Sequence, residues 1–236
     1  MWLIQFLKSS FFLSNLASWS MTKIPAVVEH NVEKYWAIKK AFFITALEHL
    51  EGDYLEFGVF TGGSFVCALR AHRSLRFLGE IETKFYGFDS FSGFGKVSED
   101  DKHPFYQNST FSVNEEKVVK NIKKRAGDLP VQIVSGYFED TLRGKTAQSL
   151  GVRKARVVLI DCDLKEPTIL SLDFLAPVLQ EGTIVIMDDF FSYKGSESRG
   201  VAGGFSEFCK KNPDILWRKI CDYGYGGVAY IVSSKK

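Results

Sequence analysis

The stretch VVLIDCD at Val157–Asp163 and the stretch TIVIMDD at Thr183–Asp189 share one pattern, an apolar β-branched run that ends in acidic residues. Short apolar runs of this kind predict buried parallel strands. In open α/β sheets ligands bind just beyond the carboxyl ends of the strands, so Asp161, Asp188 and Asp189 are expected to lie close together there. Like charges at close range need raised pKa values or a cation, and the pattern therefore predicts a bound divalent metal ion.

The rest of the chain alternates between helical and strand patterns. An amphipathic helix is predicted for residues 32–50, and further strands are predicted for residues 54–57, 85–88 and 131–134, with helices between them. Regular alternation of this kind predicts an α/β fold in which helices cover both faces of a mostly parallel sheet.

The end of the chain has a different pattern. Leu216–Ile220 and Val228–Ile231 are predicted strands whose connection is too short for a helix, so they should form an antiparallel hairpin. A mostly parallel, seven-stranded sheet with a C-terminal antiparallel hairpin is the Rossmann-like architecture of class I methyltransferases. The glycine-rich residues 194–204 are interpreted as a mobile loop. We expect one domain over residues 34–236, preceded by an N-terminal helical arm over residues 1–33.

Composition restricts the classes of function. The 236 residues are 45% hydrophobic and 25% charged, which is enough apolar mass for one sizeable core. The net charge is +2 and the basic residues are scattered, so nucleic acid is not an expected partner. The four cysteines show no CxxC spacing and no disulfide framework, and a cytoplasmic setting is expected.

Residues 1–21 are apolar and aromatic, with Lys8 as the one charge. Lys8 and several polar residues interrupt the run, which argues against a spanning helix, and the features of a signal peptide are missing. The favoured interpretation is an arm that packs on the domain or on a homodimer partner. The alternatives are membrane contact through residues 1–20 as an interfacial helix, and a true start of the protein at Met21.

The stretch LEFGVFTGGS at residues 55–64 passes from a strand through a glycine loop into a helix. Glycines let a ligand approach the backbone, and the helix N-terminus supplies hydrogen-bond donors. The spacing does not match the dinucleotide-binding fingerprint. It resembles the first motif of S-adenosylmethionine-dependent methyltransferases, in which the acidic residue lies near the amino-acid portion of the cofactor. The residues expected at the cofactor from this motif are Glu56, Gly58, Thr61, Gly62 and Ser64.

Two further strand ends complete the predicted cofactor site. Asp89 and Ser90 follow the second strand, and a carboxylate there can accept two hydrogen bonds from the ribose hydroxyls of a nucleoside. After the third strand, Gly136, Tyr137 and Phe138 offer backbone donors and aromatic surface to the adenine ring. Considered singly, Asp89 could instead cap a turn and the aromatic residues could fill core.

Taken together, these motifs resemble the macrocin O-methyltransferase (TylF-type) family of sugar hydroxyl methyltransferases. The resemblance runs from about residue 34 to residue 232. It is carried by EFG and GGS within residues 56–64, YGFDSF at 86–91, IDCDL at 160–164 and MDDF at 187–190.

The resemblance implies a Mg²⁺ site at Asp161, Asp188 and Asp189, with Asp161 also beside the cofactor. It implies methyl transfer from S-adenosylmethionine to a hydroxyl of a sugar, a glycan or a glycosylated small molecule. Ligand sets made of oxygen alone suit Mg²⁺, and a Mg²⁺ ion held by a few carboxylates keeps water positions that the acceptor's hydroxyls can replace.

An acceptor hydroxyl must also lose its proton to a base. His103 lies in the long loop of residues 92–110, and loops of this length inside a compact domain are typically functional or disordered. The family uses a loop histidine as the base, so His103 is the first candidate. Asp163, two residues after a predicted metal ligand, is the competing candidate.

Two other functions remain as alternatives. A phosphatase of the haloacid dehalogenase type also places acidic residues from two strands around Mg²⁺, but its nucleophilic aspartate normally lies on an early strand, whereas three βα units precede Asp161 here. A non-catalytic nucleotide-binding protein is the second alternative, and the intact cofactor and metal motifs argue against it.

Overall fold

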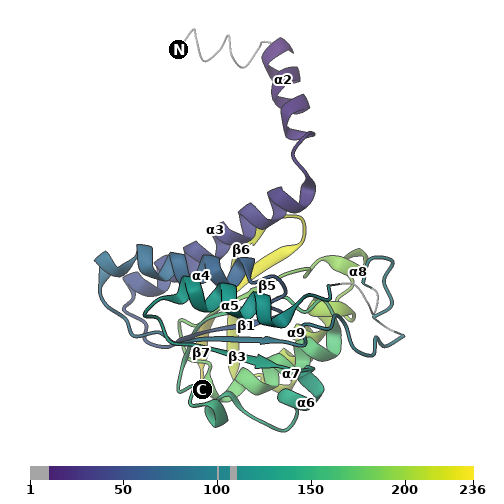
Figure 1. The fold of residues 1–236 in the computed structure, drawn as a ribbon. Coiled ribbons are helices and arrows are strands. Elements are labelled where there is room, and N and C mark those ends of the chain that lie inside the picture. The colour runs from purple at the N-terminus through teal and green to yellow at the C-terminus, as the bar shows by residue number, and fades with distance from the viewer. Residues whose placement is uncertain (1–10, 100, 107–110) are drawn as a thin grey trace.

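A computed structural model of the chain describes residues 11–99, 101–106 and 111–236 (Figure 1). Its centre is a seven-stranded sheet in the order β3-β2-β1-β4-β5-β7-β6. The strands are β1 (Asp53–Phe57), β2 (Phe85–Asp89), β3 (Val131–Ser135), β4 (Ala155–Ile160), β5 (Ile184–Met187), β6 (Ile215–Tyr223) and β7 (Gly227–Lys235). The pairs among β1 to β5 are parallel, and β7 runs antiparallel to both β5 and β6. The predicted sheet and its C-terminal hairpin are confirmed.

Helices cover both faces of the sheet (Figure 1). On one face lie α3 (Ala26–Leu47), α4 (Gly63–Ser74) and α5 (Glu115–Ala126), and on the other lie α7 (Lys165–Leu175) and α9 (Gly200–Lys211). The connections contain α6 (Phe138–Thr141), α8 (Ser192–Gly195) and the 3₁₀ turns η1 (Arg76–Leu78), η2 (Ala147–Leu150) and η3 (Ala176–Val178).

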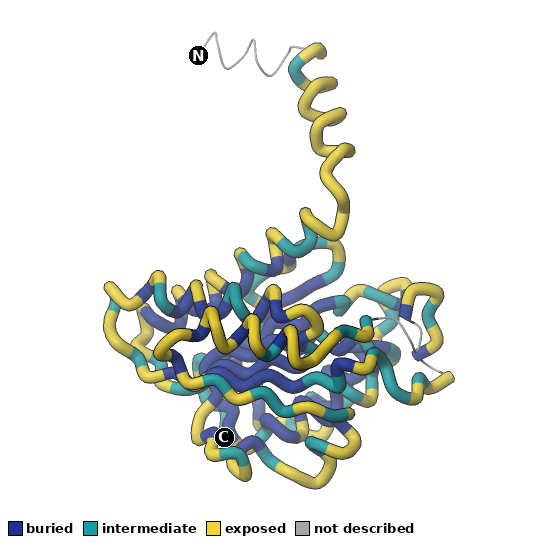
Figure 2. The backbone as a smooth tube through the Cα atoms, viewed as in Figure 1, coloured by how far each residue is buried: buried dark blue, intermediate teal, exposed yellow. Residues whose placement is uncertain are grey.

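The two layers follow from the alternation of side chains along the strands. In β4, Val157 and Leu159 pack with α3 and α4, while Val158 and Ile160 pack with α7 and α9. Every residue of β4 is buried, as the dark blue centre of Figure 2 shows. A central strand buried on both faces gives the continuous apolar run seen in the sequence.

β4 also carries a buried cation, Arg156, which is only 2% exposed. Its guanidinium donates to Thr45 Oγ1 at 2.8 Å and to the carbonyl oxygen of Phe42 at 3.3 Å, both near the C-terminal end of α3, and to Thr83 Oγ1 at 3.3 Å. Burial lowers the pKa of Arg156 to about 10. These oxygens are neutral, and the partial negative charge of the helix C-terminus contributes to the balance of charge.

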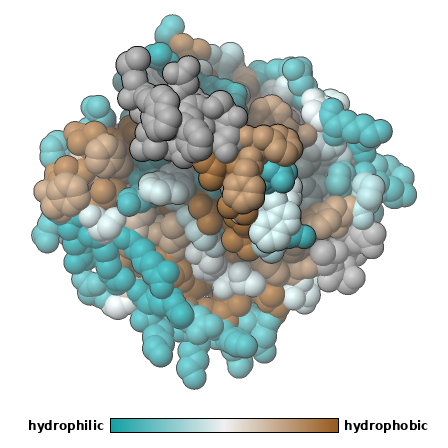
Figure 3. Space-filling model, turned by 90° about the horizontal axis from the view of Figure 1, so that it is seen from above, coloured by the Kyte–Doolittle hydropathy of each residue, from teal (hydrophilic) through white to brown (hydrophobic). Residues whose placement is uncertain are grey.

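The N-terminal region differs from the prediction. α3 begins at Ala26 and crosses the expected boundary between residues 33 and 34. The preceding helix α2 (Phe11–Met21) projects away from the domain and is exposed apart from the half-buried Leu13, so its described residues do not pack on the domain, the first of the two predicted arrangements of the arm (Figure 1). Figure 3, a view onto this end, shows hydrophobic groups near the centre of the face and also at its left edge, with hydrophilic groups along the lower and right edges.

Residues 1–10 of the arm lie outside the described residues, and the homodimer partner stays a prediction. In the described ranges, none of the helices combines the length and the apolar character needed to cross a membrane.

The prediction of a mobile loop over residues 194–204 was wrong, because α9 begins at Gly200. Its glycines allow close packing. A Cβ atom on Gly203 would lie 2.4 Å from the carbonyl carbon of Ser198, and one on Gly204 would lie 2.7 Å from Cβ of Thr168 in α7. Tight contact with α7 therefore compensates for the low helix propensity of glycine.

Candidate functional site

A cavity of about 570 Å³, a volume typical of small-molecule sites, lies at the carboxyl ends of the parallel strands. The predicted site residues in its wall are Gly58, Asp89, Ser90, Tyr137, Phe138, Asp161, Asp163, Asp188 and Asp189. Because β1 and β4 are central, residues that follow β2 and β3 lie toward one side of the cavity and residues that follow β4 and β5 toward the other. We call these the cofactor side and the acceptor side.

Gly58 joins the two sides through the backbone. Its φ is +95°, and a Cβ atom there would lie 1.8 Å from the carbonyl oxygen of Asp161, so only glycine fits. The Gly58 N–H donates to the carbonyl oxygen of Phe88 at 2.9 Å, and the Asp161 N–H donates to that of Phe57 at 2.8 Å. The end of β1 is thus held against both neighbouring strands.

Glu56 lies behind the cavity wall and is fully buried. Its carboxylate accepts a hydrogen bond from Ser64 Oγ at 2.6 Å and another from the Tyr54 hydroxyl. Burial raises the pKa of Glu56 to about 8. Glu56 and Ser64 therefore tie the start of α4 to β1, and Thr61, Gly62 and Gly136 likewise lie outside the wall. Direct contact of these residues with a cofactor stays a prediction.

Asp89 lies in the wall at the end of β2. Its two carboxylate oxygens accept hydrogen bonds from the backbone N–H groups of Phe60 and Phe91, each at 2.6 Å, and burial raises its pKa. A carboxylate has further lone pairs, which can accept ribose hydroxyls from the cavity. The Tyr137 ring lies beside Gly95, where a Cβ atom would be 3.2 Å from it. The sequence interpretation missed Gly95, which leaves the ring its space.

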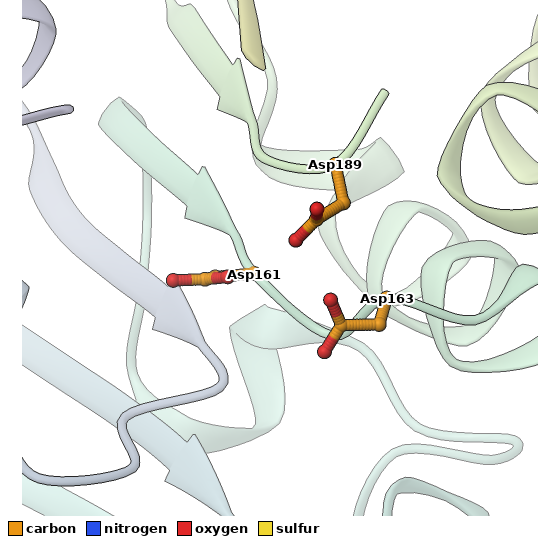
Figure 4. Close-up of side chains that lie close together, drawn as sticks. All are labelled: Asp161, Asp163 and Asp189. Carbon is orange, nitrogen blue, oxygen red and sulfur yellow. The ribbon is translucent and has the colours of Figure 1, made fainter. Parts of the chain in front are cut away.

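Three carboxylates meet on the acceptor side, as Figure 4 shows. Asp161 and Asp163 follow β4, Asp189 follows β5, and one oxygen of each lies within 4.8 Å of the others. Burial raises the pKa of Asp161 to about 7, and burial and the Asp189 carboxylate raise the pKa of Asp163 well above its usual range. Asp163 and Asp189 have φ values of +63° and +50°, an uncommon backbone conformation that is often found at functional sites.

Asp188 is engaged elsewhere, which differs from the predicted metal set of Asp161, Asp188 and Asp189. It is 2% exposed and accepts hydrogen bonds from His30 Nε2 at 3.1 Å and from the Tyr223 hydroxyl at 3.0 Å. It also forms an ion pair with Lys34. Burial opposes its charge, but the bond from His30 and the charge of Lys34 outweigh burial and hold the pKa of Asp188 well below its usual range.

The sequence interpretation missed Lys34 and His30, both on α3. Lys34 Nζ lies 2.8 Å from Asp161 Oδ2, and although burial disfavours the ammonium, Asp161 and Asp188 raise its pKa overall. The hydrogen bond to Asp188 raises the pKa of His30, whose Nδ1 accepts the N–H of Tyr225 at 3.2 Å. Their i, i+4 spacing, which places both on one face of a helix, was the available signal.

The connection between β2 and α5, here called the β2–α5 loop, is described at residues 90–99, 101–106 and 111–114. Tyr106, also missed, donates its hydroxyl to Asp189 Oδ1 at 2.9 Å. His103 stacks on Tyr106 at 4.5 Å between ring centroids and meets the Tyr193 ring edge-on at 5.0 Å. The loop thus reaches the acidic cluster through Tyr106, whereas His103, the first candidate for the base, lies outside the cavity wall.

Aromatic rings form much of the remaining wall. Phe111 lies edge-to-face with Phe60, Phe94 and Phe105, at centroid distances of 5.4, 5.5 and 5.8 Å. All four line the cavity, as do Phe191 and Tyr225. The basic side chains among the described lining residues are His30, Lys34 and Lys96, and the first two already contact Asp188.

The known proteins that this chain resembles are O-methyltransferases. The family model of macrocin-O-methyltransferases (TylF) matches residues 34–205. The 8-demethyl-8-(2,3-dimethoxy-alpha-L-rhamnosyl)-tetracenomycin-C 4'-O-methyltransferase of Streptomyces olivaceus is 32% identical over 149 residues, which are 59% of this chain and 53% of that protein. The demethyldecarbamoylnovobiocin O-methyltransferase of Streptomyces niveus is 32% identical over 152 residues, 60% of this chain and 54% of that protein.

The match therefore spans about half the length of these curated relatives. Among solved structures, the O-methyltransferase NovP is similar with a TM-score of 0.67 and 26% sequence identity, over 87% of this chain and 81% of that chain.

Proposed function

The chain belongs to the macrocin O-methyltransferase (TylF) family, and from that premise we propose that it transfers the methyl group of S-adenosylmethionine to a sugar hydroxyl of a glycosylated small molecule, with Mg²⁺. One observation carries the proposal. A single cavity has Asp89 on its cofactor side and the cluster of Asp161, Asp163 and Asp189 on its acceptor side. A nucleoside cofactor and a hydroxyl acceptor would therefore meet in one cavity.

The cofactor side suits S-adenosylmethionine. Asp89 would accept the ribose hydroxyls, and Tyr137 and Phe138 would flank the adenine ring. Gly58 gives the ligand close access to the backbone. Behind this surface, the hydrogen bonds of Glu56 keep the glycine loop in place.

The acceptor side suits a hard cation. Its donors are carboxylate oxygens alone, and burial together with neighbouring acids raises the pKa of Asp161 and Asp163, although Lys34 lies beside Asp161. We propose Asp161 and Asp189 as the Mg²⁺ ligands, because Mg²⁺ is usually bound through one or two carboxylates with several waters. When bound, the ion would supply charge stabilisation to the acceptor oxygen as its proton leaves.

Asp163 is the proposed base. It lies in the cavity wall beside both proposed ligands, where its carboxylate would face a hydroxyl held at the ion. His103 packs between aromatic rings outside the wall and is the competing base. Asp188, neutralised by Lys34 and His30, would hold α3 against the site without binding the ion.

The cavity wall and the names of the relatives both support a glycosylated small molecule as the acceptor. The first relative's name describes methylation at a rhamnosyl tetracenomycin. Here the rings of Phe60, Phe94, Phe105 and Phe111 offer an apolar surface to a sugar ring and to an attached aglycone. Lys96 is the lining cation that does not contact Asp188, which suits a neutral glycoside better than a diphosphate sugar.

Calorimetry with S-adenosylhomocysteine, with and without Mg²⁺, tests the first part of the proposal. We expect binding by the wild-type protein, and about tenfold weaker binding by Asp89→Asn, because a charged acceptor of the ribose hydroxyls is lost. A folded sample that binds no S-adenosylhomocysteine contradicts the proposal. Methyl transfer to a panel of neutral glycosides, followed by mass spectrometry, then identifies the acceptor class.

A set of three variants separates the roles on the acceptor side. Asp163→Asn should keep the Mg²⁺ affinity and abolish turnover if Asp163 is the base, whereas a loss of Mg²⁺ affinity would make it a ligand. Asp188→Asn should leave the Mg²⁺ affinity within a few fold of wild type. His103→Ala should keep turnover, and its inactivation with intact cofactor binding would move the role of base to His103.

A further inference from the structure

We propose that Asp101 is a positioning residue that fastens the β2–α5 loop over the acceptor side of the cavity. The inference rests on the proposed function for its effect on turnover, and on the structure alone for its effect on the loop. Asp101 is 2% exposed although it belongs to a polar loop. A carboxylate buried in this way needs hydrogen-bond donors, and the structure supplies them from two distant helices.

Asp101 caps the N-termini of α7 and α9 together. Its carboxylate oxygens accept the N–H of Lys165, the first residue of α7, at 3.2 and 3.3 Å, and its Oδ1 accepts the N–H of Gly200, the first residue of α9, at 3.3 Å. The residues at the N-cap positions, Leu164 and Arg199, make no side-chain capping bond to their own helices. One carboxylate from a separate loop therefore does the work of two local caps.

Charge favours this arrangement as well as hydrogen bonding. The N-terminus of a helix carries partial positive charge, so a carboxylate placed at two of them is stabilised by both. Ser98 adds a donor from within the loop, from Oγ to Oδ2 of Asp101 at 3.1 Å. An uncharged side chain at this position would lose the electrostatic part even where it kept a hydrogen bond.

The backbone beside Asp101 is held by the same region of the protein. The Tyr193 hydroxyl donates to the carbonyl oxygen of Asp101 at 3.0 Å, and Arg199 Nη2 donates to that of Lys102 at 3.2 Å. The loop is therefore attached to α8, α7 and α9 through side-chain and backbone bonds of two adjacent residues, Asp101 and Lys102.

This attachment determines what the loop presents to the cavity. Five residues after Asp101, Tyr106 donates to Asp189, a proposed Mg²⁺ ligand, and Phe105 belongs to the wall. At the start of α7, Lys165, which donates to Asp101, follows Asp163 by two residues. Asp101 thus connects the loop that covers the acceptor to the segment that carries the proposed base, although it contacts neither reacting group.

The experiment compares Asp101→Ala and Asp101→Asn with the control Glu99→Gln, an exposed position on the same loop that is paired with Lys102. The Lys102 side chain is 66% exposed, so trypsin can reach it and cleavage after Lys102 reports how often the backbone opens. From the usual effect of losing two helix caps, we expect Asp101→Ala to be cleaved there about thirtyfold faster than wild type. Asp101→Asn should be intermediate. Glu99→Gln removes the ion-pair partner of Lys102 and leaves the bonds of Asp101 intact, so its rate gives the effect of releasing the lysine alone and should stay well below that of Asp101→Ala.

Kinetics distinguish positioning from general destabilisation. We expect Asp101→Ala to raise KM for the acceptor about tenfold while its affinity for S-adenosylhomocysteine stays at the wild-type value, because the Asp101 carboxylate bonds to Ser98, α7 and α9 rather than to residues of the cofactor side. Where Asp101→Ala does not fold, the same two measurements on Asp101→Asn and on Ser98→Ala decide the matter. Unchanged cleavage after Lys102 in the folded variants overturns the proposal.

The two proposals fail in different ways. A wild-type protein that binds no S-adenosylhomocysteine refutes the proposed function, and the protease measurement still decides whether Asp101 holds the loop. Active variants with wild-type KM and wild-type protection at Lys102 refute the role of Asp101 and leave the proposed function intact.

Discussion

The cofactor side and the acceptor side of the cavity are stabilised by different forces. On the cofactor side, Glu56 accepts hydrogen bonds from neutral hydroxyl groups, and Asp89 accepts them from backbone N–H groups. On the acceptor side, four aspartates gather near one protein ammonium, Lys34, and one imidazole, His30. The cofactor side is therefore complete as it folds, whereas the acceptor side keeps an excess of negative charge that a cation would relieve.

The largest expected effect tests that excess of charge. Asp189→Asn should reduce Mg²⁺-dependent turnover about a thousandfold, because one proposed ligand and the charge that stabilises the developing alkoxide are lost together. Affinity for S-adenosylhomocysteine should not change. Steady-state kinetics and calorimetry measure the two quantities, and the exposed position Asp214, substituted by Asn, serves as the control. Equal losses of turnover and of affinity for S-adenosylhomocysteine would show that the two sides do not act separately.

The second-largest expected effect concerns the backbone contact between Gly58 and Asp161, which joins the two sides of the cavity. Gly58→Ala should destabilise the fold by about 3 kcal/mol or more, because its Cβ atom would overlap the Asp161 carbonyl oxygen and its φ of +95° is strained for alanine. Gly144→Ala has a similarly positive φ of +71° but open space around it, and should cost only about 1 kcal/mol. Urea denaturation of both variants separates overlap from backbone strain, and equal losses would rule out the contact as the cause.

Lys34→Met tests the protein's own cation. Removing the ammonium leaves Asp188 buried with one cationic partner fewer, so the free energy of unfolding should fall by about 3 kcal/mol. Lys40→Met, an exposed position on the same helix, should fall within about 0.5 kcal/mol of wild type. If the acceptor side lacks positive charge, added Mg²⁺ should restore part of the lost stability in Lys34→Met. Unchanged stability would mean that the ion pair contributes nothing.

The smallest expected effect comes from a group beneath α3, His72, which is 7% exposed and packs edge-on against Phe42 and Phe85. Burial lowers its pKa to about 4 from the ordinary 6.5, so the unfolded chain takes up the proton first as the pH falls. The contribution of His72 to the free energy of unfolding is fully present above pH 6.5 and is lost as the pH falls toward 4. The loss amounts to about 2 kcal/mol after allowance for solvent screening. Thermal melts over this range should show a flatter slope for His72→Phe, and equal slopes would contradict the assignment.

The cofactor side was largely predictable because its residues are close in sequence. Ser64 and Glu56 are eight positions apart, and the N–H of Phe60 reaches Asp89 across 29 positions within one βαβ unit. Local patterns therefore located the strand ends and the glycine loop. Even here the role of Glu56 was missed, because the sequence pattern cannot show that its carboxylate accepts hydrogen bonds from Tyr54 and Ser64 inside the protein.

The acceptor side was only partly predictable because its contacts join distant segments. Lys34 and Asp161 are 127 positions apart, and Tyr106 and Asp189 are 83 apart. The two acidic strand ends were visible in the sequence, but the choice between Asp163 and Asp188 depends on which of them meets the cations of α3. A single sequence holds no signal for such a pairing, and the same reason explains why Asp101 passed unnoticed beside His103.

Arg156 bears on where the chain can be shortened. Its guanidinium, which belongs to β4, donates hydrogen bonds to the C-terminal end of α3. Separation of α3 from the sheet would leave this buried charge without those acceptors. The amide protons of α3 should therefore exchange only when the whole sheet opens. The described residues of α2 other than Leu13 are exposed. A truncation that begins near Lys23 should therefore fold and melt like the full chain, whereas one that begins at Lys34 cuts into α3, removes His30 and should be poorly folded.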